Sequence, residues 1–502
     1  MDFIVGKAVP KREDRIGATE TFGGKLSELV CGRGNGCLAN RSRLFCQTCN
    51  CQMGLALSMI NTIPDIVIIK HGSVGCGNSS QVDKNFINGL KARGLSVKPL
   101  VWVSTNLDET DVITGGEEKL RKAIAKLDAL HRPAAIVVLT TCSTGIIGDD
   151  VDSVVEEMRG KVSTPIILVH CEGFKTKISA TAYDAVYHGL LGGLAFTDED
   201  EEEPICERDI YRLNRDYKKQ RTLNVFNAFS IGRNDELELQ RLLNALELNV
   251  NFYPNFSHPE SFKYISEASL NVGLCPTHDD YFLKYLEARF GIPYLINNMP
   301  VGIKNTRDWL LEIAERFDAK DAANRILEME TRVLEDALEP LREKLTGKRV
   351  FVTGGEIRVV VTAMLLEELG CKLVGLRGHH YDEFGDGIYA KLLENHADMD
   401  VNIATTQTFE LANLIRRAAP DLILAHNGSH ITAAKLGVPS LPVYSQGNFY
   451  MGFMGAFEVA RRAAKVLENT AYVKKLSENT RLPYHPAWFE KDPFTYIKAN
   501  EL

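Results

Sequence analysis

Short apolar segments alternate with amphipathic segments along this chain, and no other feature constrains its fold as strongly. Strand-like runs occur at DIVIIKHG (65–72), VKPLVWVST (97–105) and AAIVVLTTC (134–142). Helical patterns such as EEKLRKAIAKLDAL (117–130) and DDVDSVVEEM (149–158) separate or follow them. Apolar strands that alternate with helices are typical of parallel sheets covered by helices on their faces. The sequence therefore predicts an α/β fold.

The same pattern restarts twice, and 502 residues are too many for one ordinary hydrophobic core. An acidic run, TDEDEEEPICERD (197–209), predicts a solvated connector. New strand–helix patterns begin at TLNVFNAFS (222–230) and at GKRVFVTGGEIR (347–358). We expect an N-terminal extension followed by three α/β domains, with boundaries at 1–50, 51–215, 216–345 and 346–502.

Charge and hydropathy exclude several classes of protein. A net charge of −8 without a basic stripe argues against a nucleic-acid partner. No run of about 18 apolar residues predicts a membrane span, and the N-terminus lacks the apolar core of a signal peptide. We therefore expect a cytoplasmic protein with no membrane partner. No GxxxxGKS or GxxxxGKT motif occurs, so the chain is not expected to hydrolyse ATP itself.

Four cysteines lie in segments that suit the binding of an iron–sulfur cluster, for which thiolates are the usual protein ligands. They are Cys51 in NCQMG, Cys76 in HGSVGCGNSS, Cys142 in TTCSTGIIGDD and Cys275 in NVGLCPTHDD. Three of them follow predicted strands, where a parallel sheet delivers side chains into a crevice. Gly75 and Gly77 flank Cys76 and let the backbone approach a bulky cluster. Cys275 precedes a helix that we expect to begin at Asp279 or Asp280, whose positive end favours a thiolate.

The other cysteines allow two interpretations. In a reducing compartment a crowded set indicates metal ligation or reactive thiols, but single cysteines also behave as small buried hydrophobes. Both interpretations stay open for Cys31, Cys37, Cys46 and Cys49. We expect burial for Cys171, Cys206 and Cys371.

Glycines and histidines near predicted strand ends are further candidates for a site. Gly354 and Gly355 form a turn between a strand and a helix, where backbone can approach an anion closely. His71 is expected to orient the loop of Cys76 by hydrogen bonding. Four histidines also follow predicted strands, and each is either a hydrogen-bonded structural residue or a ligand: His379, His380, His426 and His430.

An ordered set of motifs extends over roughly residues 45 to 470. The motifs are CQMGLAL, KHGSVGCGNSS, ETDVITGGEEKL, TTCSTGIIGDD, VHCEGF, LNVGLCPTHDDYFLKYLEARFGIPYL, VTGGEIR and PVYSQGNFYMGFMGAFEVARR. In this order they resemble the α-type (D) subunits of the nitrogenase component-1 superfamily. The resemblance implies the component-1 fold, in which three Rossmann-like domains have parallel sheets flanked by helices.

The resemblance also implies two metal sites and two partners. By motif, Cys51, Cys76 and Cys142 correspond to the ligands of a P-cluster, an 8Fe–7S electron relay shared with a β-type (K) subunit in an α2β2 heterotetramer. Cys275 corresponds to the anchor of a large cofactor of the 8Fe–9S–C or a related type. An ATP-hydrolysing iron protein is the electron donor in this family.

The sequence departs from nitrogenase proper around that cofactor. Tyr444 falls near the place of the histidine that binds the far metal, and Gly428 near that of a lysine that helps to hold homocitrate. Tyr183 and Ser179 occupy roughly the places of a catalytic histidine and glutamine. These exchanges argue against dinitrogen reduction. His426 is the first choice for closing the far end of the cofactor, because it stands nearest a strand terminus.

Within the superfamily the chain most resembles the catalytic subunit of methylthio-alkane reductase, which cleaves a carbon–sulfur bond in small thioethers and releases methanethiol and a hydrocarbon. Tyr183 and Lys84 are expected to donate protons or hydrogen bonds there. The alternatives are a scaffold for cofactor maturation and a dinitrogen-reducing α subunit. A dark-operative tetrapyrrole reductase is disfavoured by Cys275, and a sensor of the periplasmic-binding type would contain no iron.

Overall fold

The computed structural model describes residues 8–34, 38, 41–47, 51–76, 83–97, 99–196, 217–227, 230–296, 298–426 and 428–499. The chain forms two compact units, which are described separately. Unit 1 comprises Met1–Arg12, Cys51–Phe229 and Glu247–Ile296, and unit 2 comprises Glu13–Asn50, Ser230–Leu246 and Asn297–Leu502.

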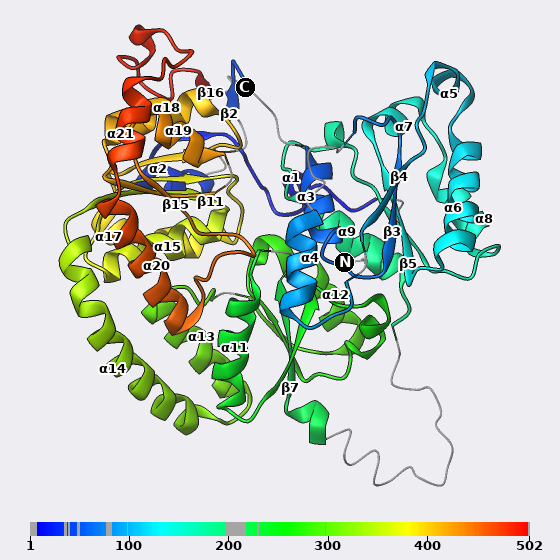
Figure 1. Cartoon of the computed structure of the whole chain (residues 1–502), viewed down its shortest axis with the longest axis horizontal. Helices are drawn as coiled ribbons and strands as arrows, with labels where there is room; N and C mark the ends of the chain where they lie inside the picture. The colour runs from blue at the N-terminus through cyan, green and yellow to red at the C-terminus, as the bar shows by residue number, and fades with distance from the viewer. Residues whose placement is uncertain are drawn as a thin grey trace. The chain divides into compact units, whose positions relative to one another are not determined.

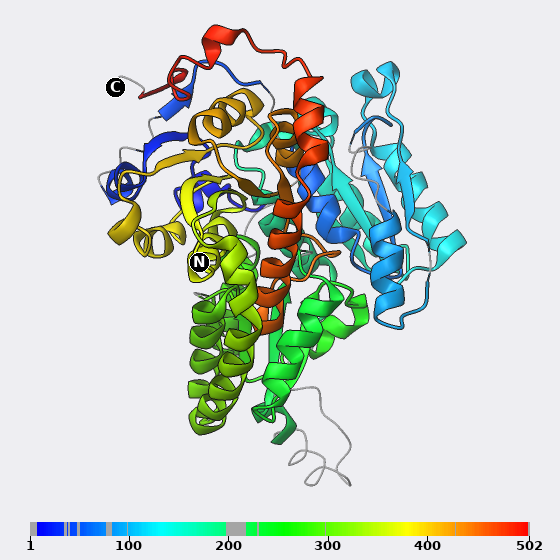
Figure 2. The ribbon, with the colours of Figure 1, turned by 60° about the vertical axis from the view of Figure 1, so that its left-hand side comes forward.

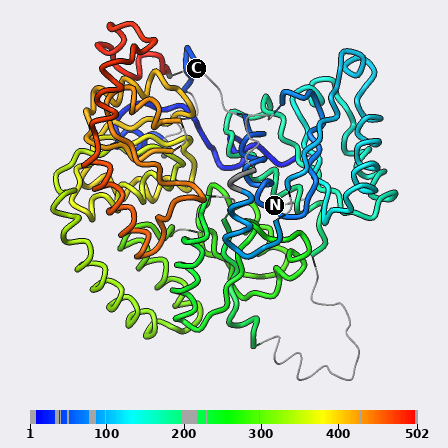
Figure 3. Tube along the Cα trace, viewed as in Figure 1, coloured from blue at the N-terminus to red at the C-terminus, as the bar shows by residue number. Residues whose placement is uncertain are grey.

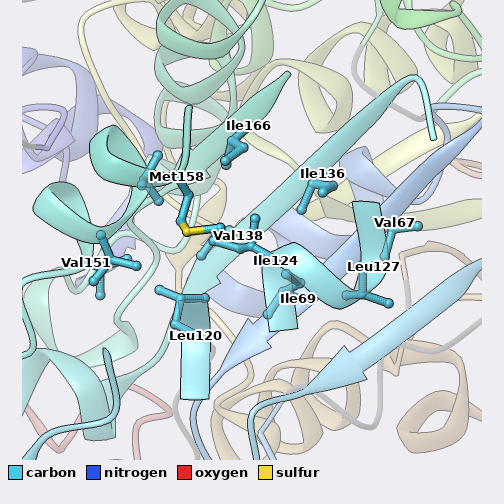
Figure 4. Close-up of a cluster of buried hydrophobic side chains, with 12 residues drawn as sticks. Val67, Ile69, Leu120, Ile124, Leu127, Ile136, Val138, Val151, Met158 and Ile166 are labelled. Carbon is cyan, nitrogen blue, oxygen red and sulfur yellow. The ribbon is translucent and has the colours of Figure 1, made fainter. Parts of the chain in front are cut away.

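The first sheet of unit 1 has four parallel strands. Their order is β4 (Val101–Ser104), β3 (Ile66–His71), β5 (Ala135–Thr140) and β6 (Ile166–Val169). Helices α6 (Glu117–His131) and α8 (Val151–Arg159) cover one face (Figure 1). Their apolar side chains interlock with alternate residues of the strands in one buried cluster (Figure 4). Each strand contributes every second residue to this cluster, as the pleat of a sheet requires.

The second sheet of unit 1 is also parallel. Its order is β10 (Tyr294–Leu295), β9 (Leu270–Gly273), β7 (Thr222–Asn227) and β8 (Asn249–Pro254). Helix α12 (Pro276–Phe290) follows β9 and packs against α9 (Thr181–Gly193), which in turn packs against β6 and α3 (Gln52–Ile60). Helices α9 and α12 therefore join the two sheets of this unit.

Unit 2 is built on a six-stranded sheet. Its order is β1 (Phe22–Lys25), β13 (Asp400–Ile403), β12 (Lys372–Gly378), β11 (Arg349–Gly354), β14 (Leu422–Ala425) and β15 (Ser440–Pro442). Only β1 is antiparallel to its neighbour, and the blue N-terminal trace lies beside the yellow trace of this sheet (Figure 3). The long helices α14 (Lys320–Leu345) and α20 (Gly452–Glu468) run side by side (Figure 2).

The remaining elements are short helices, connecting helices and one small ribbon. In unit 1 they are α4 (Asp83–Ala92), α5 (Glu109–Thr114), α7 (Cys142–Ile147), and the 3₁₀ turns η2 (Gly173–Lys175) and η3 (Pro259–Tyr264). In unit 2 they are α2 (Leu26–Gly34), α11 (Arg233–Asn244), α13 (Ile303–Arg316), α15 (Glu356–Glu368), α16 (Gly385–Ala390), α17 (Leu393–His396), α18 (Thr408–Ala418), α19 (Ser429–Lys435), α21 (Ala471–Glu478), η4 (Pro486–Trp488) and the antiparallel pair β2 (Arg41–Arg43) and β16 (Ile497–Ala499). The short α1 (Arg12–Arg15) lies where the two units meet along the chain.

The predicted α/β architecture with parallel sheets flanked by helices is confirmed. One predicted helix start is wrong: α12 begins at Pro276, three residues before the expected start at Asp279. A proline at the first helical position costs no hydrogen bond and has the φ that a helix needs, so the helix starts directly after Cys275. Within the described part of the chain, no helix combines the length and the apolar character needed to cross a lipid bilayer.

Candidate metal centres

Three cysteines of unit 1, Cys51, Cys76 and Cys142, come together and form what we call the three-thiol site. Cys142 begins α7 directly after β5, and Cys76 lies in the turn after the neighbouring parallel strand β3. Cys51 is the N-cap residue of α3. Its thiol is exposed, whereas those of Cys76 and Cys142 are half-buried. Two of the thiols thus come from the ends of adjacent strands, and the third comes from a helix terminus.

Gly173 makes room between two of these thiols. A Cβ atom at Gly173 would lie 2.6 Å from the Sγ of Cys51 and 3.7 Å from the Sγ of Cys142. Any larger residue would therefore displace the Cys51 thiol. The Nε2 of Gln52 donates a hydrogen bond of 2.7 Å to the carbonyl oxygen of Glu172, which attaches the start of α3 to the segment that carries Gly173.

The three thiols influence one another's ionisation. Burial raises the pKa of Cys76, and the charges of Cys51 and Cys142 raise it further. Thiolates that oppose one another's ionisation are stabilised when they share bound metal, because the positive ions reverse the local field. The three-thiol site therefore fits an iron–sulfur cluster.

Hydrogen bonds hold the two strand ends in place. His71 contacts the Oγ1 of Thr105 through Nδ1 at 3.0 Å and the Oδ2 of Asp149 through Nε2 at 3.1 Å. The hydroxyl of Thr141 donates to the carbonyl oxygen of His71 at 2.9 Å. As expected, His71 is a buried, hydrogen-bonded residue that orients the loop leading to Cys76.

A charged network fixes the segment that carries Gly173. Burial opposes the charge of His170, but the nearby carboxylates of Asp152 and Glu172 outweigh it and raise the pKa of His170 to about 9. Burial likewise opposes the charge of Glu172, yet His170 and Lys175 bring the pKa of that carboxyl down to about 2. An ion pair therefore persists beside the three-thiol site across the neutral range.

The fourth cysteine lies at a helix terminus elsewhere in unit 1. Cys275 follows β9, caps α12 and is 3% exposed. Its carbonyl oxygen accepts hydrogen bonds from the backbone N–H groups of His278 (2.9 Å) and Asp279 (3.1 Å). The rings of Tyr183 and His278 have centroids 4.4 Å apart, so the structure brings Tyr183 close to the start of this helix. Cys275 therefore stands at the positive end of a 15-residue helix.

The other predicted cofactor residues lie in unit 2. Gly354 ends β11, Gly355 caps α15, and His426 follows β14. Burial lowers the pKa of His426 to about 4, so its imidazole is neutral and can act as a ligand at physiological pH. The predicted cofactor residues thus belong to both units: Cys275 to unit 1, and Gly354, Gly355 and His426 to unit 2.

Tyr444 has a structural position in unit 2. Its hydroxyl donates to the carbonyl oxygen of Arg358 at 3.1 Å and lies 2.7 Å from the Oγ1 of Thr362, whose own hydroxyl can donate in return. A Cβ atom at Gly354 would lie 2.7 Å from the tyrosine ring. The packing of the Tyr444 ring therefore needs a glycine at position 354. The sequence did not reveal this contact.

Some predicted residues lie outside the described part of the structure. Lys84 belongs to α4, but its side chain is not described. The structure also does not describe Gly77, Cys37, Cys49 and Cys206. Cys31 and Cys46 are exposed, and Cys171 and Cys371 are buried as expected. Sequence reasoning missed Gly173, Gln52 and His278, although each stands within two or three residues of a cysteine in a recognised motif.

The structure thus has α/β units and a three-thiol site, in which two cysteines follow neighbouring parallel strands and the third caps a helix. Residues 51–468 match the family model described as nitrogenase component 1 type oxidoreductase. This match includes most of the chain, which therefore belongs to that family.

Similar proteins fall into two kinds. The nitrogenase molybdenum-iron protein alpha chain of Methanothermobacter marburgensis is 27% identical over 450 residues, with 87% of this chain and 89% of that protein covered. The nitrogenase iron-molybdenum cofactor biosynthesis protein NifE of Rippkaea orientalis is 28% identical over 420 residues, with 81% and 82% covered. The solved structure of nitrogenase Cp1 at pH 5 superposes with a TM-score of 0.68 at 19% identity, with 90% and 99% covered, and supports the fold.

Proposed function

We propose that the chain is the catalytic α-type subunit of a nitrogenase-like reductase that cleaves carbon–sulfur bonds of small methylthio-alkanes. The observation that carries the reductase assignment is the convergence of three thiols, two of which lie on either side of the space at Gly173. In the proposal the three-thiol site holds a P-type 8Fe–7S cluster, and Cys275 anchors a cofactor of the 8Fe–9S–C type. When bound, these groups supply electron transfer and the reducing centre.

The reaction needs two electrons and two protons for each thioether. The carbon–sulfur bond breaks, one proton adds to the carbon to give the hydrocarbon, and the other adds to the sulfur to give methanethiol. The electrons come from an ATP-hydrolysing iron protein. Tyr183, buried against His278 near Cys275, is a candidate to hold or donate a proton, and Lys84 is a second candidate.

The choice of substrate rests on the groups around the cofactor. The hydroxyl of Tyr444, which falls near the place of the terminal histidine of nitrogenase, is hydrogen-bonded within α15. A buried, protonated phenol is a poor replacement for an imidazole ligand, and burial raises the pKa of Tyr444 further above its usual value. This supports chemistry other than dinitrogen reduction.

Exposed apolar side chains beside the three-thiol site support a partner subunit. Val74, Ile146 and Phe174 are 52%, 70% and 54% exposed. Val74 is two residues from Cys76, Ile146 is on α7, and Phe174 follows Gly173. Apolar residues gathered around a site that is open on one side are typical of a protein interface. A β-type (K) subunit that completes the cluster in an α2β2 assembly fits this surface.

The similarity to NifE supports a second candidate, a scaffold for cofactor maturation. The anaerobically purified complex should be incubated with iron protein, ATP and a methylthio-alkane. Methanethiol production supports the reductase, whereas transfer of a cluster to a cofactor-free acceptor without turnover supports the scaffold. Reduction of dinitrogen would instead indicate a nitrogenase α subunit. Iron, molybdenum and vanadium analysis with EPR would identify the bound metals.

Cys275→Ala separates the two sites. We expect this change to abolish thioether reduction and to preserve the EPR signal of the P-type cluster, because Cys275 is not part of the three-thiol site. Cys371→Ala, at a buried cysteine of unit 2, is the control and should retain both. Loss of both signals in Cys275→Ala would contradict separate roles.

A further inference from the structure

A second group of metal-ligating side chains lies in unit 2. Glu356 is the first residue of α15, and His380 and Asp382 lie in the segment after β12. Their exposed fractions are 0%, 5% and 0%, so the group, which we call the carboxylate–histidine cluster, is sealed from solvent within this chain. Parallel strands β11 and β12 are neighbours, which brings the residues that follow them together.

Backbone hydrogen bonds orient both carboxylates. The Oε1 of Glu356 accepts the backbone N–H of Asp382 at 2.6 Å, and the Oδ1 of Asp382 accepts the backbone N–H of Phe384 at 3.0 Å. The second oxygen of each carboxylate faces His380, whose Nε2 lies 3.6 Å from the Oε2 of Glu356 and 3.4 Å from the Oδ2 of Asp382. Hydrogen bonds of this kind typically preorganise the ligands of a metal.

These separations suit a shared ion better than direct hydrogen bonds. A hydrogen bond from nitrogen to oxygen spans about 2.7–3.2 Å. Two ligands each about 2.1 Å from a tetrahedral metal ion lie about 3.4 Å apart. All three ligand atoms lie within 4.8 Å of one another. Among the residues that the structure describes, the Nε2 of His380 has no hydrogen-bond partner, although it is buried and faces both carboxylates.

Tyr389 adds a second buried polar group beside the cluster. Its side chain is fully buried, and its hydroxyl has no hydrogen-bond partner among the described residues. Burial raises the pKa of Tyr389 well above its usual value, and the charges of Glu356 and Asp382 raise it further. A neutral hydroxyl beside these carboxylates can donate a hydrogen bond to one of them or to a bound water molecule.

We propose that Glu356, His380 and Asp382 bind a divalent first-row transition metal ion, for which Zn²⁺ has the best-fitting geometry. One imidazole and two carboxylates form an N/O ligand set of the kind that binds Zn²⁺, Fe²⁺ or Mn²⁺. The bound ion ties the segment after β12 to the first turn of α15 and so stabilises unit 2.

Mn²⁺ is a suitable probe, because carboxylates and imidazole bind it, whereas cluster-binding thiolates prefer softer metals. The full-length protein, purified anaerobically and freed of exchangeable cations with a chelator, is titrated with Mn²⁺ while EPR measures the unbound ion. We expect one site per chain, release of Mn²⁺ when Zn²⁺ is added, and a rise in the thermal midpoint with Zn²⁺. Affinity should fall at least about ten-fold in Glu356→Gln and in His380→Gln.

Glu367→Gln is the matched control. It removes the carboxylate of another histidine pair in unit 2, in which the Nε2 of His396 lies 2.5 Å from the Oε1 of Glu367, and it should leave Mn²⁺ binding unchanged. Failure of the wild-type protein to bind either ion would overturn the proposal, as would equal binding in Glu356→Gln. If Glu356→Gln does not fold, equal binding in His380→Gln is the outcome that overturns it.

Discussion

The carboxyl ends of the parallel strands carry candidate ligands in both units, but the two sets differ in exposure. In unit 1 the three-thiol site has one exposed and two half-buried cysteines, with exposed apolar residues around them. In unit 2 the carboxylate–histidine cluster is almost completely buried. Tyr444, which follows β15 in the same sheet, is also buried.

The difference agrees with what the two proposed sites would require. A cluster shared between two subunits needs thiols that remain accessible until the partner covers them. Carboxylates that serve a single chain can be sealed, provided that an ion or hydrogen bonds compensate for the loss of water. Accessibility therefore distinguishes a site that is completed by assembly from one that is completed by folding.

The largest expected effect is on the iron content of the three-thiol site. Gly173→Ala places a methyl group 2.6 Å from the Sγ of Cys51, too close for the thiol to keep its position, so we expect loss of most of the iron at the three-thiol site while the fold is retained. Iron analysis and circular dichroism measure the two properties. The control is Gly192→Ala, because a Cβ atom there meets no described atom within 4 Å. Unchanged iron content in Gly173→Ala would show that Cys51 does not need this space.

A smaller effect is expected on stability, from the charged network of His170 beside the three-thiol site. The raised pKa of His170, about 9 against 6.5 in the unfolded chain, means that its stabilisation is complete below pH about 6.5 and is lost as the pH rises through about 9. His170→Gln should therefore lower the free energy of unfolding by on the order of 2 kcal/mol near pH 6 and have little effect above about pH 10. Denaturant unfolding at both pH values measures this.

The matched control for the network is His131→Gln, at an exposed histidine that ends α6. It should not alter the pH dependence of stability. A destabilisation of His170→Gln that is the same at both pH values would mean that packing, and not charge, accounts for the role of His170.

The smallest effect on stability is expected at Tyr444, which is buried in unit 2. Tyr444→Phe removes the hydrogen bonds to Thr362 and Arg358 but keeps the ring against Gly354. We expect a loss of about 1 kcal/mol in the free energy of unfolding and no change in iron content. Tyr472→Phe, at a 75% exposed tyrosine of unit 2, is the control and should leave stability unchanged. Loss of iron in Tyr444→Phe would show that this hydroxyl contributes to a metal site.

Several local features were predictable from the sequence. The strands β3, β5 and β7 lie where apolar runs predict them, because burial on both faces requires continuous apolar residues. The pattern at 149–158 begins with two aspartates, which favour a helix start, and Asp150 caps α8, since its carboxylate accepts the backbone N–H of Ser153. In contrast, β1 belongs to an extension in which no strand was predicted, and it forms only because β13 offers an edge to pair with.

The sequence by itself determined the α/β class, the positions of the strands and the four cysteines with their family motifs, because these depend on local periodicity and on residue type. Only the tertiary structure revealed that Gly173 separates two thiols, that Tyr444 packs against Gly354, and that Glu356 faces His380. These contacts join residues between 24 and 122 positions apart in the chain. Their distances depend on how strands and helices pack, which no local pattern encodes.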